Sequence, residues 1–134
     1  IDAPCSGTGT MRRHPEIPWR LTEKDVTVEL PKLQLTMLKE AAARVAAGGE
    51  LIYATCSVFD EENTQVVDAF LASPEGADFT VAPLSEAQIL QLPEFEQAKQ
   101  LVSVRQNDRG LFQSVPVNAD SYDGHFCARL IRKQ

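Results

Sequence analysis

The fold is decided by the stretch Leu51-Ile52-Tyr53-Ala54-Thr55-Cys56-Ser57. It is an apolar run with aromatic and β-branched residues, and it follows the glycine pair Gly48-Gly49. A run of this length and composition is typical of a strand that is fully buried in a parallel sheet. Its polar end would then lie at the carboxyl end of the strand, where open α/β sheets bind their ligands. The sequence therefore makes Cys56 a candidate nucleophile.

A second cysteine lies in a similar setting at the start of the sequence, in Asp2-Ala3-Pro4-Cys5-Ser6-Gly7. The residues before Cys5 fit the end of an apolar strand, and a small-residue loop follows. Apolar residues at helical spacing predict a helix over residues 31–47, between this strand and the strand over residues 50–56. A single crossover helix makes two parallel strands neighbours by default. We therefore expect Cys5 and Cys56 to face one crevice.

The other predicted elements complete an α/β pattern. A helix begins near Asp60, its N-cap, and ends at Ser73-Pro74. A capping box at residues 85–88 opens a short helix, and a second short helix is expected over about 94–101. After a turn at residues 107–110 come two strands, 111–117 and 126–131, joined by a polar turn over 118–124. The two strands should pair antiparallel at the edge of the sheet. The order strand, helix, strand, helix indicates the α/β class.

Size and composition limit the function. The 134 residues, 43% of them hydrophobic, provide one core, and no apolar run approaches the length that spans a bilayer. A net charge of −6 argues against a general nucleic-acid binder, because phosphate binding needs clustered Lys and Arg. We expect a cytoplasmic protein with no membrane partner. Because the sequence starts within a strand and without methionine, we also expect it to be the C-terminal half of something larger.

Three cysteines at wide spacing fit neither a disulfide framework nor a zinc site. No metal site is therefore expected, and the compartment should be reducing. Cys127 lies within a predicted strand and is read as a small buried apolar residue. A redox pair of Cys5 and Cys56 is disfavoured, because the spacing lacks Cys-x-x-Cys geometry. Two readings stay open for Trp19, which could stack on a base or pack half-buried.

Several motifs together resemble the Sun-type (RsmB-like, NOP/Sun) RNA cytosine-5 methyltransferases. The resemblance covers nearly the whole chain except about residues 76–112. The motifs that carry it are Asp2 to Gly9, Arg12-Arg13-His14-Pro15-Glu16 with Trp19, Gly48 to Ser57, Glu62-Asn63, Val66-Val67 and Asp123-Gly124-His125-Phe126, in which His125 departs from the family's Asp-Gly-Phe-Phe.

The resemblance implies the C-terminal half of a Rossmann-like class I S-adenosylmethionine-dependent methyltransferase fold. Residues 1–134 would be a partial catalytic domain that lacks the cofactor-loop half and the N-terminal RNA-binding domain. By the family's pattern Cys56 is the nucleophile that adds to cytosine C6, and Cys5 promotes product release. Asp2 matches the acid that orients the base and binds the cofactor, S-adenosylmethionine. The partner is RNA, and we expect ribosomal RNA of the small subunit.

The partial domain has consequences of its own. The fragment alone should be inactive and should bind S-adenosylmethionine weakly, because most cofactor contacts of the family lie upstream of Asp2. Its exposed sheet edge could pair with another chain, so we expect self-association of the fragment. The alternative function is a non-catalytic truncated module that binds RNA or a protein partner.

Overall fold

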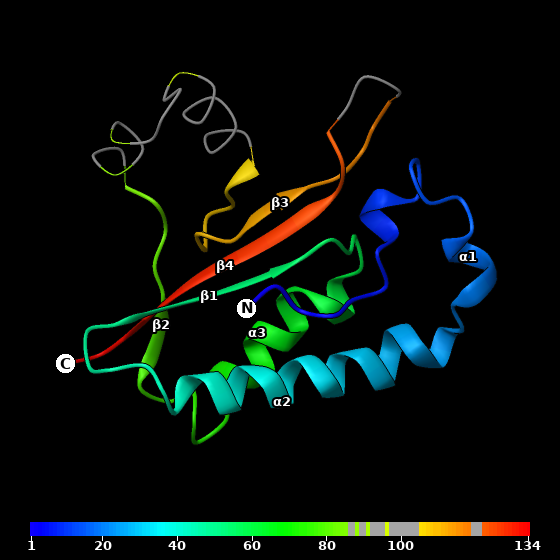
Figure 1. The fold of residues 1–134 in the computed structure, drawn as a ribbon. Coiled ribbons are helices and arrows are strands. Elements are labelled where there is room, and N and C mark those ends of the chain that lie inside the picture. Colours follow the sequence, from blue (N-terminus) through cyan, green and yellow to red (C-terminus); the bar gives the residue numbers. More distant parts are fainter. Residues whose placement is uncertain (86–87, 89–90, 92–95, 97–104, 119–121) are drawn as a thin grey trace.

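The computed structural model describes residues 1–85, 88, 91, 96, 105–118 and 122–134 (Figure 1). Within these residues, the chain begins with helical segments, and helices and strands then alternate from α2 to β2. The elements are η1 (Thr8–Thr10), α1 (Ile17–Arg20), η2 (Asp25–Glu29), α2 (Leu30–Ala42), β1 (Glu50–Thr55), η3 (Asp60–Glu62), α3 (Thr64–Leu71), β2 (Phe79–Val81), β3 (Phe112–Ser114) and β4 (His125–Arg132). No helix among the described residues has the length and apolarity needed to cross a membrane.

The long strand β4 lies at the centre of the sheet. It pairs antiparallel with β1 on one side and with β2 and β3 on the other. Residues 1–3 run parallel to the free side of β1, where the Ala3 N–H donates to the Ala54 carbonyl over 2.9 Å and the Ala54 N–H donates to the Ile1 carbonyl over 2.9 Å. The predicted adjacency of the two cysteine strands is therefore confirmed.

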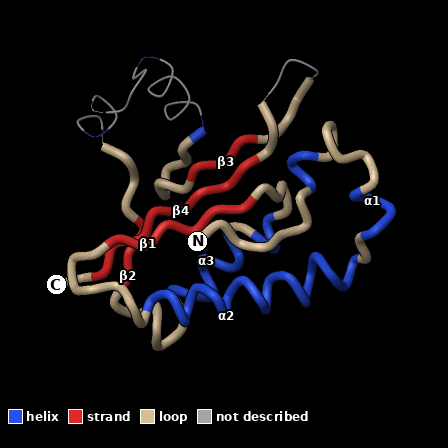
Figure 2. Tube along the Cα trace, in the orientation of Figure 1, coloured by secondary structure: helices blue, strands red, loops and turns tan. Residues whose placement is uncertain are grey.

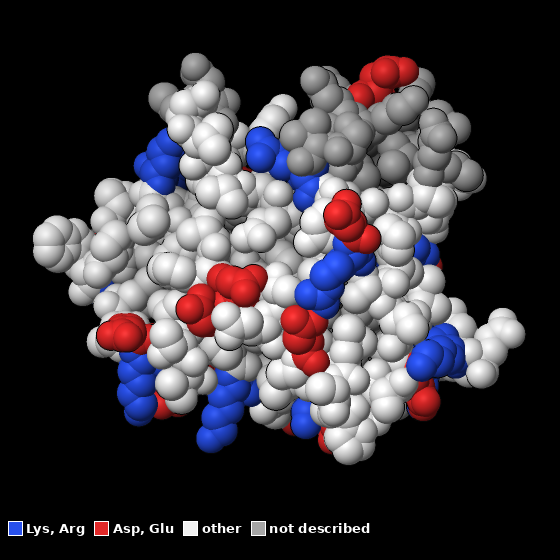
Figure 3. Space-filling view, turned by 180° about the vertical axis from the view of Figure 1, so that it is seen from behind, with Lys and Arg blue, Asp and Glu red and all other residues white. Residues whose placement is uncertain are grey.

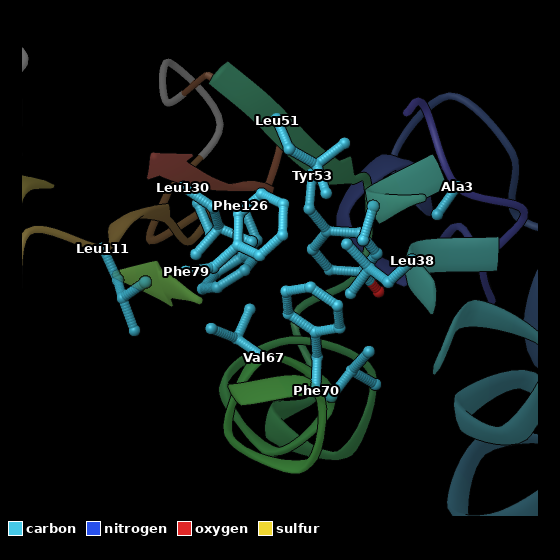
Figure 4. Packing of buried hydrophobic residues seen from close by; sticks show 13 residues of the cluster. Ala3, Leu38, Leu51, Tyr53, Val67, Phe70, Phe79, Leu111, Phe126 and Leu130 are labelled. Carbon is cyan, nitrogen blue, oxygen red and sulfur yellow. The ribbon is translucent and has the colours of Figure 1, made fainter. Parts of the chain in front are cut away.

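The helices α2 and α3 lie on the same side of the sheet and bury its apolar face (Figures 1 and 2). Tyr53 and Phe126 of the sheet meet edge to face, with ring centroids 6.2 Å apart, and point toward Val67 and Phe70 of α3 (Figure 4). All four side chains are buried. Burying side chains of this size contributes about 2 kcal/mol each and fixes β1 on the helices.

Two predictions about the sheet are wrong. The strand β1 is not buried on both faces, since its residues alternate and Ile52 on the outer face is 47% exposed. The apolar sequence allows burial on both faces, but within the described residues α2 and α3 cover only one. The strands near 112 and 126 do pair antiparallel. However, β4 is central in the sheet rather than at its edge, because it also pairs with β1 and β2.

The helix boundaries also differ from prediction. Helix α2 ends at Ala42 rather than at residue 47 and follows a π-helical turn, η2, that the sequence did not indicate. Asp60 is not the N-cap of α3, because it lies in the separate turn η3 and Asn63 precedes the helix. The three-residue strand β2 was too short to give a periodic signal.

Two local predictions in the same part of the chain are confirmed. Residues 107–110 form a turn, in which the Gly110 N–H donates to the Asn107 carbonyl over 2.8 Å. Ser85 and Gln88 form the reciprocal hydrogen bonds of a capping box. Most residues of the helix expected over 94–101, and of the one that this box opens, lie outside the described residues.

The close approach of Gly9 and Gly124 gives a first testable prediction. The Gly124 N–H donates to the Gly9 carbonyl over 2.9 Å, and a Cβ on Gly9 would overlap the Gly124 backbone. Gly9→Ala should therefore lower the free energy of unfolding by about 3 kcal/mol or more. Gly48→Ala is the control, because its φ of 73° costs about 1 kcal/mol but its Cβ would meet nothing closer than 3.8 Å. Urea unfolding that ranks Gly48→Ala as equally damaging would contradict the packing of these two loops.

Candidate active site

The two thiols meet at the ends of neighbouring parallel segments. The Sγ atoms of Cys5 and Cys56 are 3.1 Å apart, and the Cys56 N–H donates to the Cys5 sulfur over 3.3 Å. Both side chains are partly buried, and both cysteines are free. The sequence placed them in one crevice, and the structure brings them into direct contact. A pair of thiols at the carboxyl end of neighbouring strands can divide nucleophilic and proton-transfer roles between them.

The surroundings of Cys5 raise its pKa. Burial, together with its hydrogen bond to Cys56, raises the pKa of Cys5 to about 12. Cys5 therefore keeps its proton at neutral pH and can donate it to the Cys56 sulfur.

Alkylation rates should report the raised pKa of Cys5. At pH 8 the Cys5 pKa leaves roughly a thousandfold less thiolate than an ordinary cysteine has, and the greater nucleophilicity of a basic thiolate offsets part of that loss. We expect iodoacetamide to label Cys5 at least tenfold more slowly in the folded protein than in urea. The folded rate should keep rising with pH above 9, where the rate in urea levels off. Peptide mass spectrometry measures both rates, and equal rates in the two states would contradict the raised pKa.

A buried polar network lies directly behind the thiols. The Ser57 hydroxyl donates to Glu62 Oε2 over 2.5 Å, and the Thr55 hydroxyl donates to Asn63 Oδ1 over 2.6 Å. The Phe59 N–H donates in turn to the Ser57 hydroxyl over 3.1 Å. Both hydroxyls are therefore engaged in hydrogen bonds.

Sequence reasoning missed how deeply this network is buried. Glu62 is 0% exposed, although it lies in the acidic run Asp60-Glu61-Glu62. Gln34 is buried as well, and its amide Nε2 donates to Glu62 Oε1 and to the Pro4 carbonyl, each over 3.0 Å. One signal was present, because Gln34 lies four and eight residues before Leu38 and Ala42 on the buried face of α2.

The antiparallel hairpin of β3 and β4 contacts the loop that follows Cys5 and holds it in place. Arg12 and Arg13 form ion pairs with Asp123, at 3.5 and 2.5 Å. The Gly9 N–H donates to the Cys56 carbonyl over 2.8 Å, so one loop joins the hairpin to both cysteine segments. Residues that are more than a hundred positions apart in the sequence thus hold the loop beside the thiol pair.

Asp2 lies three residues before Cys5, in the N-terminal segment that runs beside β1. Its residue is exposed, and among the described residues its carboxylate makes no hydrogen bond or ion pair. Its backbone is paired with β1. A carboxylate in this position is available to a ligand and fits a group with hydrogen-bond donors or positive charge.

The remaining sequence candidates lie away from the thiol pair. Cys127 is partly buried in β4, where burial raises its pKa, and no chemistry is assigned to it. Trp19 is 90% exposed, so the half-buried packing role is wrong. Arg129, near the C-terminus, forms an ion pair with Glu50. On the face shown in Figure 3, acidic and basic side chains are interspersed rather than gathered by sign.

Comparison with known proteins shows which family this chain is similar to. A family model described as 16S rRNA methyltransferase RsmB/F matches residues 1–131. The Ribosomal RNA small subunit methyltransferase B of Salmonella arizonae is 40% identical over 134 residues, which are 99% of this chain and 25% of that relative. The crystal structure of PH0851 superposes with a TM-score of 0.72 at 32% identity, covering 99% of this chain and 25% of that one.

A third similar protein is NSun6 from Pyrococcus horikoshii, whose crystal structure is described as holding SFG. It superposes with a TM-score of 0.70 at 20% identity, covering 100% of this chain and 29% of that one, and at this identity the likeness shows the fold alone. The α/β fold is thus the partial Rossmann-like fold of methyltransferases. The chain spans about a quarter of the length of the relatives it matches.

Proposed function

The chain belongs to the RsmB/F family of 16S rRNA methyltransferases, and on this premise we propose that it carries the cysteine pair of an S-adenosylmethionine-dependent RNA cytosine-5 methyltransferase. Membership of this family supports the conclusion that the protein is an RNA methyltransferase. The choice of cytosine C5 rests on one observation, which is the contact of Cys5 and Cys56 at 3.1 Å at the ends of neighbouring strands. In this proposal the chain supplies the cysteine half of the catalytic domain.

The nucleophile of the proposal is Cys56. Cytosine C5 is too weak a nucleophile to take a methyl group unaided. The Cys56 thiolate forms a bond to C6, which moves the electrons of the C5–C6 double bond to C5 and lets C5 attack an electrophilic methyl group. Loss of the C5 proton then restores the double bond and expels the Cys56 thiolate. Methylated cytosine and free enzyme result, so the thiolate is regenerated.

The second thiol, that of Cys5, would act in the release of the methylated product. Cys5 is within contact distance of Cys56, and its pKa is raised partly by its hydrogen bond to that sulfur. When Cys56 is bonded to carbon, this contribution disappears, and Cys5, which is only partly buried, gives up its proton to solvent more readily. A thiolate formed there is a strong base in a partly buried site, suited to promote loss of the C5 proton.

S-adenosylmethionine supplies the methyl group as a sulfonium when bound. Asp2 is the residue of this chain that we assign to the cofactor and to the base edge, because Asp2 is exposed and lies three residues before Cys5. It could accept a hydrogen bond from the exocyclic amine of cytosine and stabilise positive charge on the base as Cys56 adds.

The proposed substrate is ribosomal RNA of the small subunit. Support comes from the family description and from the name of the Salmonella relative, which both specify that RNA. The net charge of −6 and the interspersed charges on the face shown in Figure 3 offer little affinity for phosphate. In the proposal, RNA affinity therefore comes mainly from contacts outside these residues.

The test supplies the full-length protein with 16S rRNA and S-adenosylmethionine that carries a trideuterated methyl group. After digestion, nucleoside mass spectrometry should find 5-methylcytidine heavier by the three deuterons. Cys127→Ala is the matched control and should keep full activity, since that thiol lies away from the crevice. Label in another nucleoside would overturn the assignment to cytosine C5. No transfer to any RNA would favour the non-catalytic binding module.

A further inference from the structure

We propose that Glu62 is the positioning residue of this site, because its buried carboxylate holds the loops after Cys5 and Cys56 in one arrangement. The inference deepens the proposed function and rests on it for its catalytic consequence. Ser6 follows Cys5 directly, and Ser57 follows Cys56 directly. The Ser6 N–H donates to Glu62 Oε1 over 2.8 Å, and the Ser57 hydroxyl donates to Glu62 Oε2 over 2.5 Å. One carboxylate thus links the two cysteine loops.

The residues that precede Cys5 and Cys56 are also held by hydrogen bonds. Before Cys5, the Pro4 carbonyl accepts from Gln34 Nε2, which also donates to Glu62 Oε1. Before Cys56, the Thr55 hydroxyl donates to Asn63, the residue that follows Glu62. The segment that carries Glu62 and Asn63 therefore reaches both flanks of the thiol pair.

Glu62 is itself fixed in place. Its carbonyl accepts a hydrogen bond of 2.6 Å from the Tyr53 hydroxyl in the middle of β1. Burial raises the pKa of Tyr53, and the charge of Glu62 adds to the effect, so this hydroxyl stays a donor. The Asn63 amide donates to the Ser57 carbonyl over 2.9 Å and closes the turn from β1 to α3.

The burial of this carboxylate excludes a direct chemical role. Glu62 is 0% exposed and lies behind the thiols, so it does not touch a substrate in the crevice. Among the described residues its hydrogen-bond donors are all neutral, and no cation pairs with it. A buried carboxylate without a cation is costly, and an apolar residue would fill the same space at less cost. What an apolar residue could not do is accept from both loops at once.

Glu62→Gln in the full-length protein is the first test, because it keeps the shape and removes one acceptor oxygen. The amide NH₂ would face either the Ser6 N–H, a donor, or the Ser57 hydroxyl, which already accepts from the Phe59 N–H and the Ser6 hydroxyl. In either case one hydrogen bond between Glu62 and a cysteine loop is lost, so the thiols should lose their fixed arrangement. We expect kcat for methyl transfer to fall about 10- to 100-fold with KM for RNA nearly unchanged. Glu61→Gln is the matched control, since Glu61 is adjacent and makes no hydrogen bond to either loop; its kcat should match the wild type.

A second readout does not depend on methyl transfer. Diamide oxidises two neighbouring thiols to a disulfide and takes up both hydrogens at its N=N bond. The wild type and Glu61→Gln should form the Cys5–Cys56 disulfide rapidly, and Glu62→Gln should form it about tenfold more slowly. Peptide mass spectrometry identifies the pair, and circular dichroism establishes that each variant is folded.

The outcomes separate the inference from the proposed function. Reduced kcat with slower disulfide formation in folded Glu62→Gln supports positioning, and a variant that matches Glu61→Gln in both overturns it, even if its melting temperature is lower. If the wild type methylates no cytosine while the disulfide rates still differ, the proposed function fails and the positioning role stands. Should Glu62→Gln not fold, Gln34→Met removes one donor at similar volume. The same two losses are expected there, and their absence overturns the inference.

Discussion

Cys56→Ala should reduce methyl transfer by roughly a thousandfold or more while leaving the protein folded. Without that sulfur nothing adds to cytosine C6, and C5 stays too weak a nucleophile to take the methyl group. The fold should tolerate the change, because Cys56 is partly exposed and lies outside the apolar core. Single-turnover transfer of labelled methyl from S-adenosylmethionine to 16S rRNA measures the effect.

The control for this loss is the third cysteine. Cys127→Ala removes a partly buried thiol of similar size from β4 and should leave the rate within about twofold. If Cys56→Ala retained activity and Cys5→Ala lost it, the roles of the two thiols would be reversed. The raised pKa of Cys5 argues against that reversal.

Cys5→Ala should have a different outcome, the accumulation of a covalent RNA–protein complex. Methyl transfer still occurs, because Cys56 is present, but the adduct lacks the neighbouring thiol that promotes loss of the C5 proton. We expect the complex to rise from a trace to a large share of the protein, as a slow-migrating band on a denaturing gel. The double variant Cys5→Ala/Cys56→Ala should show no such band. A Cys5→Ala protein that turned over normally would leave Cys5 without a role in release.

The sequence predicted the placement of the two cysteines better than the surroundings that hold them. The strand at residues 50–55 and the helices on either side of it follow from apolar periodicity, and one short crossover then makes Cys5 and Cys56 neighbours. These are local signals joined by a general rule of chain topology. The same signals could not show which faces of the strand are covered, so the exposure of Ile52 was missed.

The buried network could not be predicted because its partners are distant in sequence. Glu62 lies in an acidic run, Asp60-Glu61-Glu62, that fits a solvated helix start. Only the packing of α2 against η3 shows that the third acid turns inward to meet Gln34 and Ser6. A single sequence records residue types, whereas the burial of a charge depends on which elements cover it.

The most direct test of the account is to identify the sulfur that bonds to the base. RNA containing 5-fluorocytidine traps the adduct after methyl transfer, because fluorine at C5 cannot leave as a proton does. The full-length protein would be incubated with this RNA and S-adenosylmethionine, digested with protease and nuclease, and analysed by tandem mass spectrometry. The account predicts a methylated 5-fluorocytidine attached to Cys56. Attachment to Cys5, or no attachment from an enzyme that still methylates ordinary RNA, would contradict it.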